Sequence, residues 1–519
     1  MRRLAAIILC SVMAVLSACQ SGGGNQNSSP ASVEKDGILN IGGARAYESS
    51  REGASLVFDT LTGLDEYYRA TPSIITEWKP ENDFTEYELT IREGIKFHDG
   101  TELTADIVKW NIENGGAINY CSYSYLLDKV EIVDGTHIKV SFTAPYLFFD
   151  RDLALVPCIK QDGYTEEGRF KDYVGTGPFK FEAKNEGDVT VLTRNNEYWD
   201  SEYKTDVEKV QWYFIKDAQT RKLALESGEV DILGISEHGI SIPYTVIDEL
   251  SKNDSFDFVK EEDDSYTSTA SLNTNWKKGK MKDVNLRRAF ETLFDREALV
   301  KDIFLDIPKA CGHIYNPKFD DGSTNEKEFT YSESDFKANL EKAGYTVGDG
   351  STATVDKSGE ALELKLLVGD NESEKDLAVY IQELCKQWGI TINIESTASA
   401  SGKQMLKDGD YDLVIGHPWF VPLVTSLGYM GLSSDYTDEG LGFCVNEEMK
   451  KAGEAYMMAD NSEKADQYSN EIWKIQYDQA VSIPLYVNLR YAFYNKKYEG
   501  FHFNSDVFKI DLNGVKYRQ

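Results

Sequence analysis

The first twenty positions carry an almost unbroken run of apolar residues instead of a periodic pattern. The run extends from Leu4 to Leu16, follows the basic pair Arg2 and Arg3, and ends in the letters LSAC at Cys19. It is shorter than the roughly 20 residues that a membrane-spanning helix needs, and its basic start and small-residue end are typical of a secretory signal. Small residues directly before a cysteine predict a lipoprotein signal, cleavage before Cys19 and lipidation of its thiol. An ordinary signal with an incidental cysteine is the alternative.

A polar tract with the sequence SGGGNQNSSPAS follows at residues 21–32. Segments rich in Gly, Ser and Asn behave as flexible linkers because they bury too little apolar surface to fold. We therefore expect residues 19–36 to be a tether that holds a folded body outside the membrane.

Periodic patterns begin after the tether. Tyr87, Leu89 and Ile91 alternate with polar residues, which predicts a half-buried strand over residues 86–92. Thr104 then precedes apolar residues at helical spacing, so we expect it to cap a helix.

Three later helices are predicted from their caps and apolar spacing. Asp283 is expected to begin a helix that continues to about Ile303, and Ser334 another that ends at Gly344, a typical left-handed stop. The last helix is expected at residues 462–479.

From residue 362 the apolar pattern alternates between the two-residue period of a strand and the 3.6-residue period of a helix. It predicts a strand at 362–368, a helix at 374–388, a strand at 391–395, a short helix and a strand at 411–415. This alternation indicates parallel βαβ units. After the last helix, a strand at 481–487 indicates that the C-terminus returns to the first lobe, so that strands crossing between lobes form a hinge.

Length and charge limit the function. Without the signal, about 500 residues remain, against about 150 for a typical domain, so we expect two or three lobes. The formal net charge of -32 argues against binding nucleic acid by charge attraction and is typical of a well-solvated extracellular surface.

Five of the seven cysteines lie in the body, at positions 121, 158, 311, 385 and 444. No C-x-x-C spacing occurs, which excludes the usual zinc-ribbon and thioredoxin motifs. Buried free thiols are the favoured state, with a disulfide between Cys121 and Cys158 as the alternative.

Six segments in this order resemble family 5 of the ABC-importer solute-binding proteins, its peptide and nickel group. They are FHDGTELTADIVKW (97–110), VGTGPFKF (174–181), LTRNNEYWD (192–200), RKLALESGEVDIL (221–233), LNTNWKKGKMKDVNLRRAFETLFDREAL (272–299) and VSIPLYV (481–487). The resemblance implies an α/β fold of the periplasmic-binding-protein type II kind, with two lobes and an extra subdomain in the first lobe.

This likeness sets the expected organisation of the chain. After the signal peptide (1–18) and the tether (19–36), lobe I comprises residues 37–60, 186–268 and 485–519. Its subdomain comprises residues 61–185, and lobe II residues 269–484.

The resemblance also implies a function without catalysis. We expect a monomeric extracytoplasmic receptor, lipid-anchored to the cell membrane, that closes on its ligand and delivers it to an ABC permease and ATPase complex. Such a receptor needs no resident cofactor, and nickel or a metal chelate would be its transported ligand.

The choice of ligand depends on the residues around Trp419. Peptide-binding relatives usually carry an aspartate just after this tryptophan, which pairs with the α-amino group of the peptide; here Phe420 follows. A buried ammonium without a partner would cost several kcal/mol. The Trp-x-x-Pro pattern that ends at Pro422 and the segment SEHGISIP at 236–243 resemble the nickel branch instead.

Five residues are the candidate ligand contacts. His417 is the candidate metal ligand, since neutral imidazole suits Ni²⁺, although a histidine bonded to backbone is an equal alternative. Trp419 would oppose Tyr123 and Tyr125 across a chelate, with core packing as the alternative for each. Arg45 is the candidate carboxylate clamp, because guanidinium binds carboxylate in a two-pronged geometry.

The sequence also departs from the nickel branch near Pro157. Those relatives carry an arginine near the end of the segment that reads DLALVPCIK here, where this chain has Pro157, Cys158 and Lys160. The histidines also lack H-x-x-x-H spacing, so any metal is expected to arrive already chelated.

Three other functions are alternatives. A peptide receptor would need a different amino-group anchor, such as Glu237 or Asp410, and a receptor that reports a peptide signal without import would look the same. A secreted enzyme is disfavoured because G-x-S-x-G and H-E-x-x-H motifs are absent.

Overall fold

The computed structural model describes residues 36–47, 51–119, 121–161, 163–165, 170–185, 187–235, 242–261, 269–313, 328–416, 436–437, 440–441, 445–504, 506 and 509–518. Residues Met1–Asp36 form one unit and Gly37–Gln519 a second, compact one. The predicted signal, Cys19 and nearly all of the tether lie outside the described residues.

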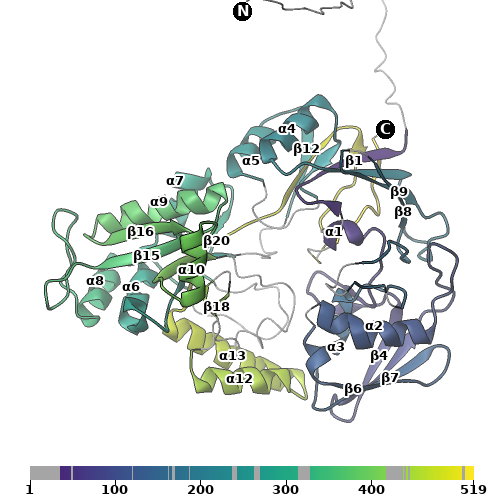
Figure 1. Cartoon of the computed structure of the whole chain (residues 1–519), viewed down its shortest axis with the longest axis horizontal. Helices are drawn as coiled ribbons and strands as arrows, with labels where there is room; N and C mark the ends of the chain where they lie inside the picture. Colours follow the sequence, from purple (N-terminus) through teal and green to yellow (C-terminus); the bar gives the residue numbers. More distant parts are fainter. Residues whose placement is uncertain are drawn as a thin grey trace, which may run out of the picture. The chain divides into compact units, whose positions relative to one another are not determined.

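Lobe I is built on a seven-stranded mixed sheet (Figure 1). Its strands, in spatial order, are β12 (Phe256–Lys260), β21 (Tyr491–Asn495), β11 (Ile232–Leu233), β1 (Ile38–Gly43), β10 (Lys209–Phe214), β9 (Val189–Arg194) and β8 (Phe179–Asn185). The helices of this lobe are α1 (Arg51–Ala54), α4 (Ala218–Ser227) and α5 (Tyr244–Ser251). The first strand, β1, runs parallel to both β10 and β11, and its Leu39 and Ile41 are fully buried.

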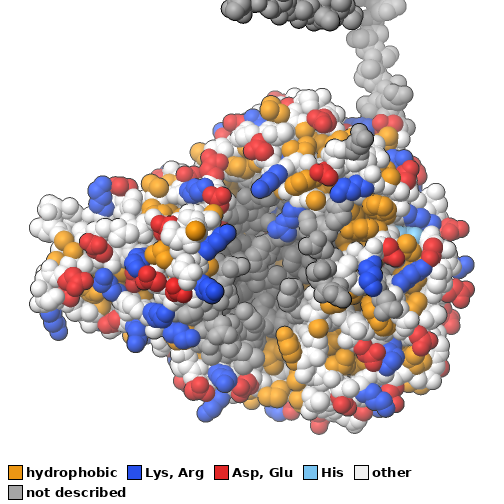
Figure 2. Space-filling view, in the orientation of Figure 1, with side chains coloured by type: hydrophobic (Ala, Val, Ile, Leu, Met, Phe, Trp, Pro, Cys, Tyr) orange, Lys and Arg blue, Asp and Glu red, His pale blue; other side chains and the backbone are white. Residues whose placement is uncertain are grey.

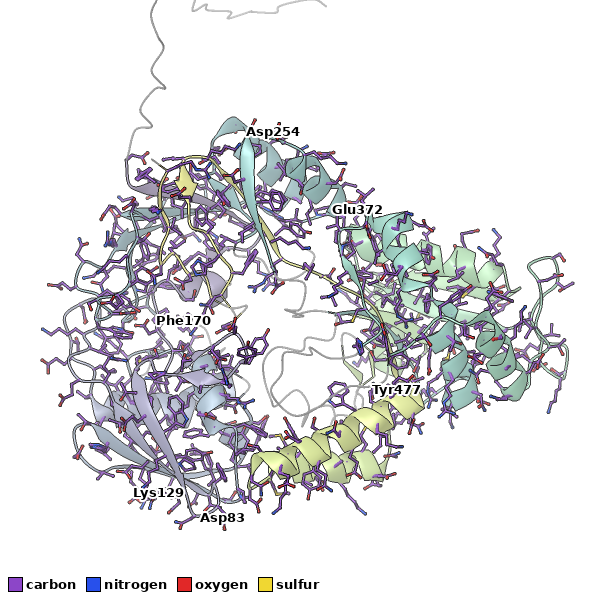
Figure 3. The ribbon with its side chains drawn as sticks, turned by 180° about the vertical axis from the view of Figure 1, so that it is seen from behind. Asp83, Lys129, Phe170, Asp254, Glu372 and Tyr477 are labelled. Carbon is purple, nitrogen blue, oxygen red and sulfur yellow. The ribbon has the colours of Figure 1, made fainter. Side chains whose placement is uncertain are left out.

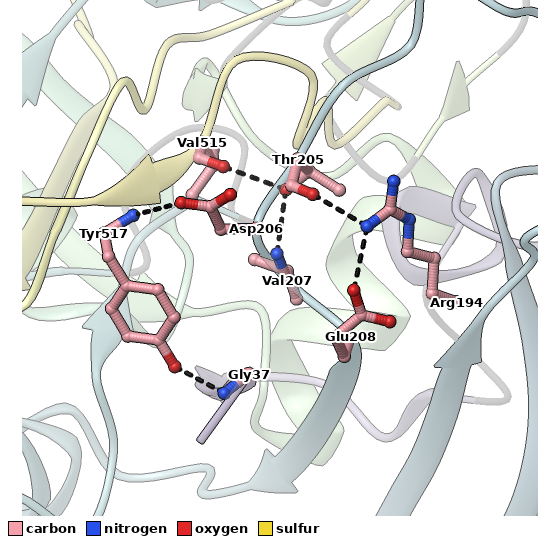
Figure 4. Close-up of polar contacts among 8 residues, drawn as sticks. All are labelled: Gly37, Arg194, Thr205, Asp206, Val207, Glu208, Val515 and Tyr517. Atoms are coloured by element: carbon pink, nitrogen blue, oxygen red, sulfur yellow. Dashed lines mark hydrogen bonds and ion pairs between the residues drawn. The ribbon is translucent and has the colours of Figure 1, made fainter. Parts of the chain in front are cut away.

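The C-terminus returns to lobe I, as the sequence predicts. Besides β21, a short pair, β22 (Tyr498–Glu499) and β23 (Lys516–Tyr517), closes the chain. Figure 4 shows how this end is held: Tyr517 N donates to Asp206 Oδ2 (2.9 Å), and its hydroxyl accepts from Gly37 N. The Thr205 hydroxyl donates to the carbonyl of Val515 (3.0 Å). These bonds join the two ends of the compact unit to each other and to residues 205–206, which lie just before β10.

The subdomain is a separate antiparallel sheet of β4 (Ile75–Glu81), β5 (Glu86–Ile91), β7 (His137–Phe142) and β6 (Leu127–Ile132). Its other elements are β2 (Gly63–Leu64), β3 (Ala70–Thr71), α2 (Ala105–Ile118), η2 (Ser122–Tyr125), α3 (Phe149–Asp152) and η3 (Leu153–Leu155). Strand β5 buries Tyr87, Leu89 and Ile91 in alternation, and Thr104 is the N-cap of α2, so both predictions are confirmed.

Lobe II contains a six-stranded sheet in the order β14 (Lys309–Ala310), β20 (Ser482–Val487), β13 (Thr269–Thr274), β17 (Leu413–Gly416), β15 (Glu363–Val368) and β16 (Thr391–Ser396). The predicted βαβ units are confirmed, because β15 pairs in parallel with both β16 and β17. A two-stranded pair, β18 (Tyr436–Thr437) and β19 (Gly440–Leu441), follows β17 in the chain.

Helices cover this sheet, with α7 and α9 above the strands and α6 and α8 below them in Figure 1. The helices of lobe II are α6 (Val284–Leu293), α7 (Arg296–Phe304), α8 (Glu333–Lys342), α9 (Glu372–Lys386), α10 (Ala400–Asp408), α12 (Glu447–Met457) and α13 (Ser462–Gln479), with a 3-10 turn η4 at Lys280–Lys282. Helix α13 has the predicted bounds.

Two helix predictions need correction. The helix expected from Asp283 to Ile303 is two helices, because Phe294 is extended and Asp295 begins a new one by accepting a hydrogen bond from Ala298 N (3.0 Å). Helix α8 is capped by Ser332, whose hydroxyl accepts from Asp335 N, and not by Ser334. The competing cap lies inside the first predicted helix, at Asp295, and two residues before the second, at Ser332.

Two strands extend across the domain boundaries that the sequence predicts. Strand β8 begins at Phe179, before the expected start of the second lobe I segment at 186, and β20 continues to Val487, beyond the expected end of lobe II at 484. The helices α12 and α13 contact the subdomain: the rings of Tyr456 and Phe148 stack with centroids 5.2 Å apart. Lobe II therefore meets lobe I away from the connecting strands as well as along them.

The body surface is highly charged. Acidic and basic side chains are interspersed over the face in view (Figure 2). Cys158, Cys311 and Cys385 are buried free thiols in the structure, and Cys121 is buried as well, whereas Cys444 lies outside the described residues.

A buried ion pair joins the two stretches of chain that connect the lobes. Glu261 follows β12 of lobe I, and Arg490 lies between β20 of lobe II and β21 of lobe I. Arg490 Nη2 and Nε donate to Glu261 Oε1 (2.9 and 3.1 Å), and both side chains are at most 4% exposed. The backbones are paired too, since Glu261 N donates to the Arg490 carbonyl (2.9 Å).

We predict that Arg490→Met strongly destabilises the protein, because it leaves the Glu261 carboxylate buried without its partner. Removing one member of a buried pair costs about 3–5 kcal/mol. Urea denaturation of the purified chain measures the loss. Lys496→Met is the control, since Lys496 makes only a half-exposed contact with Asp257 (3.8 Å) and should change stability by less than about 1 kcal/mol. Equal effects of the two substitutions would contradict the prediction.

Candidate functional site

The carboxyl ends of parallel strands are where open α/β sheets bind ligands. Strands β1, β10 and β11 are parallel, so their carboxyl ends lie at one edge of the lobe I sheet. Arg45 follows β1 by two residues, and its carbonyl accepts a hydrogen bond from Trp212 Nε1 (3.0 Å). The Arg45 side chain is exposed, and no ion pair to it occurs within the described ranges. The arrangement fixes the backbone of Arg45 and leaves its guanidinium accessible.

Two other predicted segments also follow strand ends. Strand β11 leads into residues 236–241, which include Glu237, and β17 leads directly into His417 and then Trp419. All three residues lie outside the described residues. Their roles stay predictions.

The two candidate tyrosines of the subdomain are in different environments. Tyr123 is fully buried, and its hydroxyl donates to the Ile112 carbonyl (2.8 Å); burial raises its pKa well above the usual range. Tyr125, two residues later in η2, is 89% exposed. The structure does not bring the two rings together, and the burial of Tyr123 favours its alternative role in the core.

A small cavity lies between lobe I and its subdomain. It has a volume of about 50 Å³, and its lining includes Ser55, Phe58 and Thr60 of lobe I, Asn119, Pro157 and Phe170 of the subdomain, and Asp506 and Lys509 of the C-terminal segment. Figure 3 labels Phe170, whose ring stacks on Phe58 with centroids 4.5 Å apart. Lys509 Nζ donates to the Thr60 hydroxyl (2.6 Å).

Lys509 is the cation that sequence reasoning missed. The segment DLALVPCIK (152–160) contains no arginine, and its Lys160 forms an ion pair with Asp99. Pro157 nevertheless lines a cavity with an ammonium, which the C-terminal segment supplies. No local sequence signal could have identified Lys509, because it lies 449 positions from Thr60, its hydrogen-bond partner.

The family-like segments meet at one carboxylate. Asp59 Oδ2 accepts from the Thr176 hydroxyl (2.8 Å) and from Trp199 Nε1 (2.7 Å), and Asp59 Oδ1 accepts from the Tyr198 hydroxyl (2.8 Å). Gly177 packs on the Val57 backbone so closely that an added Cβ would lie 2.7 Å from the carbonyl oxygen. The GTGP sequence is therefore a packing turn and not a phosphate loop.

His98 also serves this turn. Its Nδ1 accepts from Gly175 N (3.3 Å), and its Nε2 donates to the Gly177 carbonyl (3.0 Å). Both ring nitrogens are thus engaged with backbone. His98 is therefore a turn histidine held by backbone hydrogen bonds.

The acidic side chains of the described residues do not gather into a metal site. Asp410, a candidate amino-group anchor, pairs with Lys365 (2.7 Å), and its side chain is 65% exposed. Among the residues that the structure describes, no group of three His, Cys, Asp or Glu side chains is placed to hold a metal ion.

Sequence comparison assigns the family. The model for "Bacterial extracellular solute-binding proteins, family 5 Middle" matches residues 69–438. The chain belongs to this family. Family 5 proteins are the substrate-binding components of ABC importers, so this chain is a binding protein that works with a permease and an ATPase, and it is not an enzyme.

Curated relatives include both nickel and peptide receptors. The chain is 22% identical over 448 residues to the nickel-binding periplasmic protein of Escherichia coli (strain K12), covering 83% of each protein. It is 25% identical over 563 residues to the oligopeptide-binding protein AppA of Bacillus subtilis (strain 168), covering 98% of each.

A solved relative supports the fold. NikA from Brucella suis in complex with Fe(III)-EDTA superposes with a TM-score of 0.80 at 18% identity, covering 93% of this chain and 100% of that one. This family 5 chain therefore has the expected type II periplasmic-binding-protein fold. Its relatives act outside the cytoplasm. In the part of the chain that is described, no helix is both long and apolar enough to cross a membrane.

We predict that His98 makes stability fall on acidification. Burial lowers the pKa of His98 below its usual value, so the unfolded state binds its proton first as the pH falls below about 6.5. The contribution of His98 to the free energy of unfolding is therefore complete above that pH and decreases below it. His98→Gln should flatten the decline in melting temperature between pH 7.5 and 5.

His502 is the control of opposite sign, because its hydrogen bond with Asp511 raises its pKa. Its contribution is present at low pH and is lost as the pH rises through the raised pKa. His502→Gln should therefore steepen the decline that His98→Gln flattens. A pH profile unchanged by His98→Gln would contradict the assignment.

Proposed function

We propose that this family 5 protein is a lipid-anchored receptor that captures nickel as a metal chelate by closure of its two lobes. The receptor then delivers the chelate to its permease. The proposal is supported by the Trp-x-x-Pro sequence at 419–422, by the predicted lipidation of Cys19 and by the similarity to a nickel-binding relative.

The observation that carries the proposal is Phe420, where the resemblance to peptide receptors would place an aspartate near Trp419. A peptide has an α-amino group that needs a carboxylate partner when it is buried. Without that partner, the buried ammonium costs several kcal/mol of binding free energy. The alternative anchor Asp410 is already paired with Lys365 and largely exposed. A chelate in which the metal binds the amine has no free ammonium and so avoids this cost.

Chelation also fits the side chains available. A metal held mainly by a small chelator needs few protein ligands, so His417 could be the single protein ligand, and Arg45 could bind a chelator carboxylate. Arg45 has the exposed guanidinium that such a contact requires.

A peptide ligand is the second candidate. The similarity to AppA extends over 98% of both chains, further than the similarity to the nickel-binding relative. Co-purified peptides in a native mass spectrum of the gently purified protein would favour this function.

We predict that Ni²⁺ with excess L-histidine raises the melting temperature of the purified chain. A ligand that binds only the folded state at 100 times its Kd adds about 2.7 kcal/mol of stability. Calorimetric titration should show the same binding. The absence of heat and of any melting shift, with nickel alone and with nickel and histidine, would contradict the proposal.

His417→Ala sharpens this titration. We expect it to weaken nickel binding, and wild-type affinity should fall below about pH 6.5 because the metal binds neutral imidazole. His137→Ala is the matched control, since His137 contacts Asp134 at a turn of the subdomain. Equal binding by wild type and His417→Ala would remove His417 from the site.

We predict that Cys19→Ser releases the protein from the membrane. Without the thiol, no acyl chain can be attached, and the chain should move from the membrane pellet to the soluble fraction or remain as an uncleaved precursor. Cys10→Ser, within the same apolar run, should leave the protein in the pellet with its mature mass. Mass spectrometry distinguishes these forms, and an acylated Cys19→Ser protein would contradict the anchor.

A further inference from the structure

The cavity between lobe I and its subdomain contains a half-buried ammonium, that of Lys509. Lys509 lines this cavity, and its Nζ donates to the Thr60 hydroxyl (2.6 Å). Among the described residues, no carboxylate oxygen lies within ion-pair distance of this nitrogen. Lys516 in the same terminal segment does have such a partner, Glu499 (3.4 Å).

The hydrogen bond to Thr60 leaves the ammonium incompletely satisfied. The Thr60 hydroxyl donates its own hydrogen to the Thr62 carbonyl (2.6 Å), so toward Lys509 it acts only as an acceptor. A lysine ammonium has three N–H donors, and this bond uses one of them. Two donors remain for a group that enters the cavity.

The backbone holds Lys509 in place at this position. Lys509 N donates to the Asp506 carbonyl (3.0 Å), and the next amide, Ile510 N, donates to Ser55 Oγ (2.9 Å). The first bond closes a turn within the C-terminal segment, and the second attaches the residue after Lys509 to Ser55 of lobe I. An anchoring group gains affinity when it is positioned before the ligand arrives.

The cavity dimensions limit what can enter. A volume of about 50 Å³ has room for a carboxylate group and a few further atoms, and not for a whole peptide. Phe58 and Phe170 supply a stacked aromatic wall. Asp506 lines the same cavity and is 2% exposed, so an anion is favoured only where it contacts Lys509.

We infer that this cavity is a subsite for a carboxylate group of the transported ligand, with Lys509 as its anchor. The inference rests on the proposed function, because it assigns the carboxylate to a small chelator. An ammonium and a carboxylate in a half-buried site form a charge-assisted hydrogen bond, which is stronger than a bond between neutral groups.

The test compares two chelators that differ in the carboxylate. Nickel with L-histidine and nickel with histamine, which lacks the carboxylate, are titrated into wild type and into Lys509→Met. Wild type should bind the histidine complex about 10- to 100-fold more tightly than the histamine complex. Lys509→Met should lose most of this difference and bind the histamine complex as wild type does.

Two further variants separate charge from folding. Lys509→Arg keeps the cation and should retain a preference for the histidine complex, even if the mean affinity changes. Lys516→Met removes an ion-paired lysine of the same segment and should behave as wild type. Melting curves of all variants identify any loss of folding. If Lys509→Met does not fold, the comparison of Lys509→Arg with wild type tests the subsite instead.

The outcomes distinguish the two proposals. If wild type binds neither nickel complex, the proposed function fails and the subsite loses its basis. If wild type binds nickel histidine but Lys509→Met keeps the full preference over histamine, the subsite is overturned and the proposed function stands. A wild type that binds both complexes equally also overturns the subsite.

Discussion

The buried pair of Arg490 and Glu261 is the constraint on which the two-lobed arrangement depends. Each residue belongs to one of the two stretches that connect the lobes, and the pair binds these stretches to each other by side chains and by backbone. Burying two charges is costly, and only good geometry with further hydrogen bonds compensates. Arg490 has both: it contacts Glu261 through two nitrogens, donates to the Asn504 carbonyl (3.0 Å) and lies over the Phe503 ring. The connecting strands can therefore bend together without separating.

A second carboxylate, Asp59, explains why the sequence motifs identify the family so clearly and the ligand so poorly. It collects donors from two segments that are far apart in the chain, at Thr176 and at Tyr198 and Trp199. His98 secures the same turn from a third segment. These residues fix how lobe I packs against its subdomain, a task that does not depend on what the protein transports.

Sequence reasoning succeeded where the signal is local. The periods of 2 and 3.6 located β5, the βαβ units of lobe II and the full length of α13, because each depends on apolar spacing within one segment. It failed where two local signals compete, as at Asp295, whose side chain caps a new helix inside an apparently continuous one. Among the candidate site residues, Tyr123 and Tyr125 are both tyrosines and lie two positions apart, yet one is buried and the other exposed. Lys509 depends on a contact across almost the whole chain, which no pattern in one sequence reveals.

The lobes contact each other through their own side chains, and this bears on how binding could be signalled. Tyr244 of lobe I packs on Phe304 of lobe II (4.9 Å), and Tyr456 stacks on Phe148 of the subdomain. Moving a mostly open population to a mostly closed one takes about 5.5 kcal/mol of differential affinity, and contacts of the protein itself lower the share that the ligand must supply. Contacts that were too strong would close the empty receptor and remove the signal. The contact of α12 with the subdomain buries several apolar side chains, Met449, Ala452 and Tyr456 among them, so the packing of the protein itself favours closure. In the proposed function a ligand supplies the remainder by bridging Arg45 and Lys509 of lobe I and His417 of lobe II.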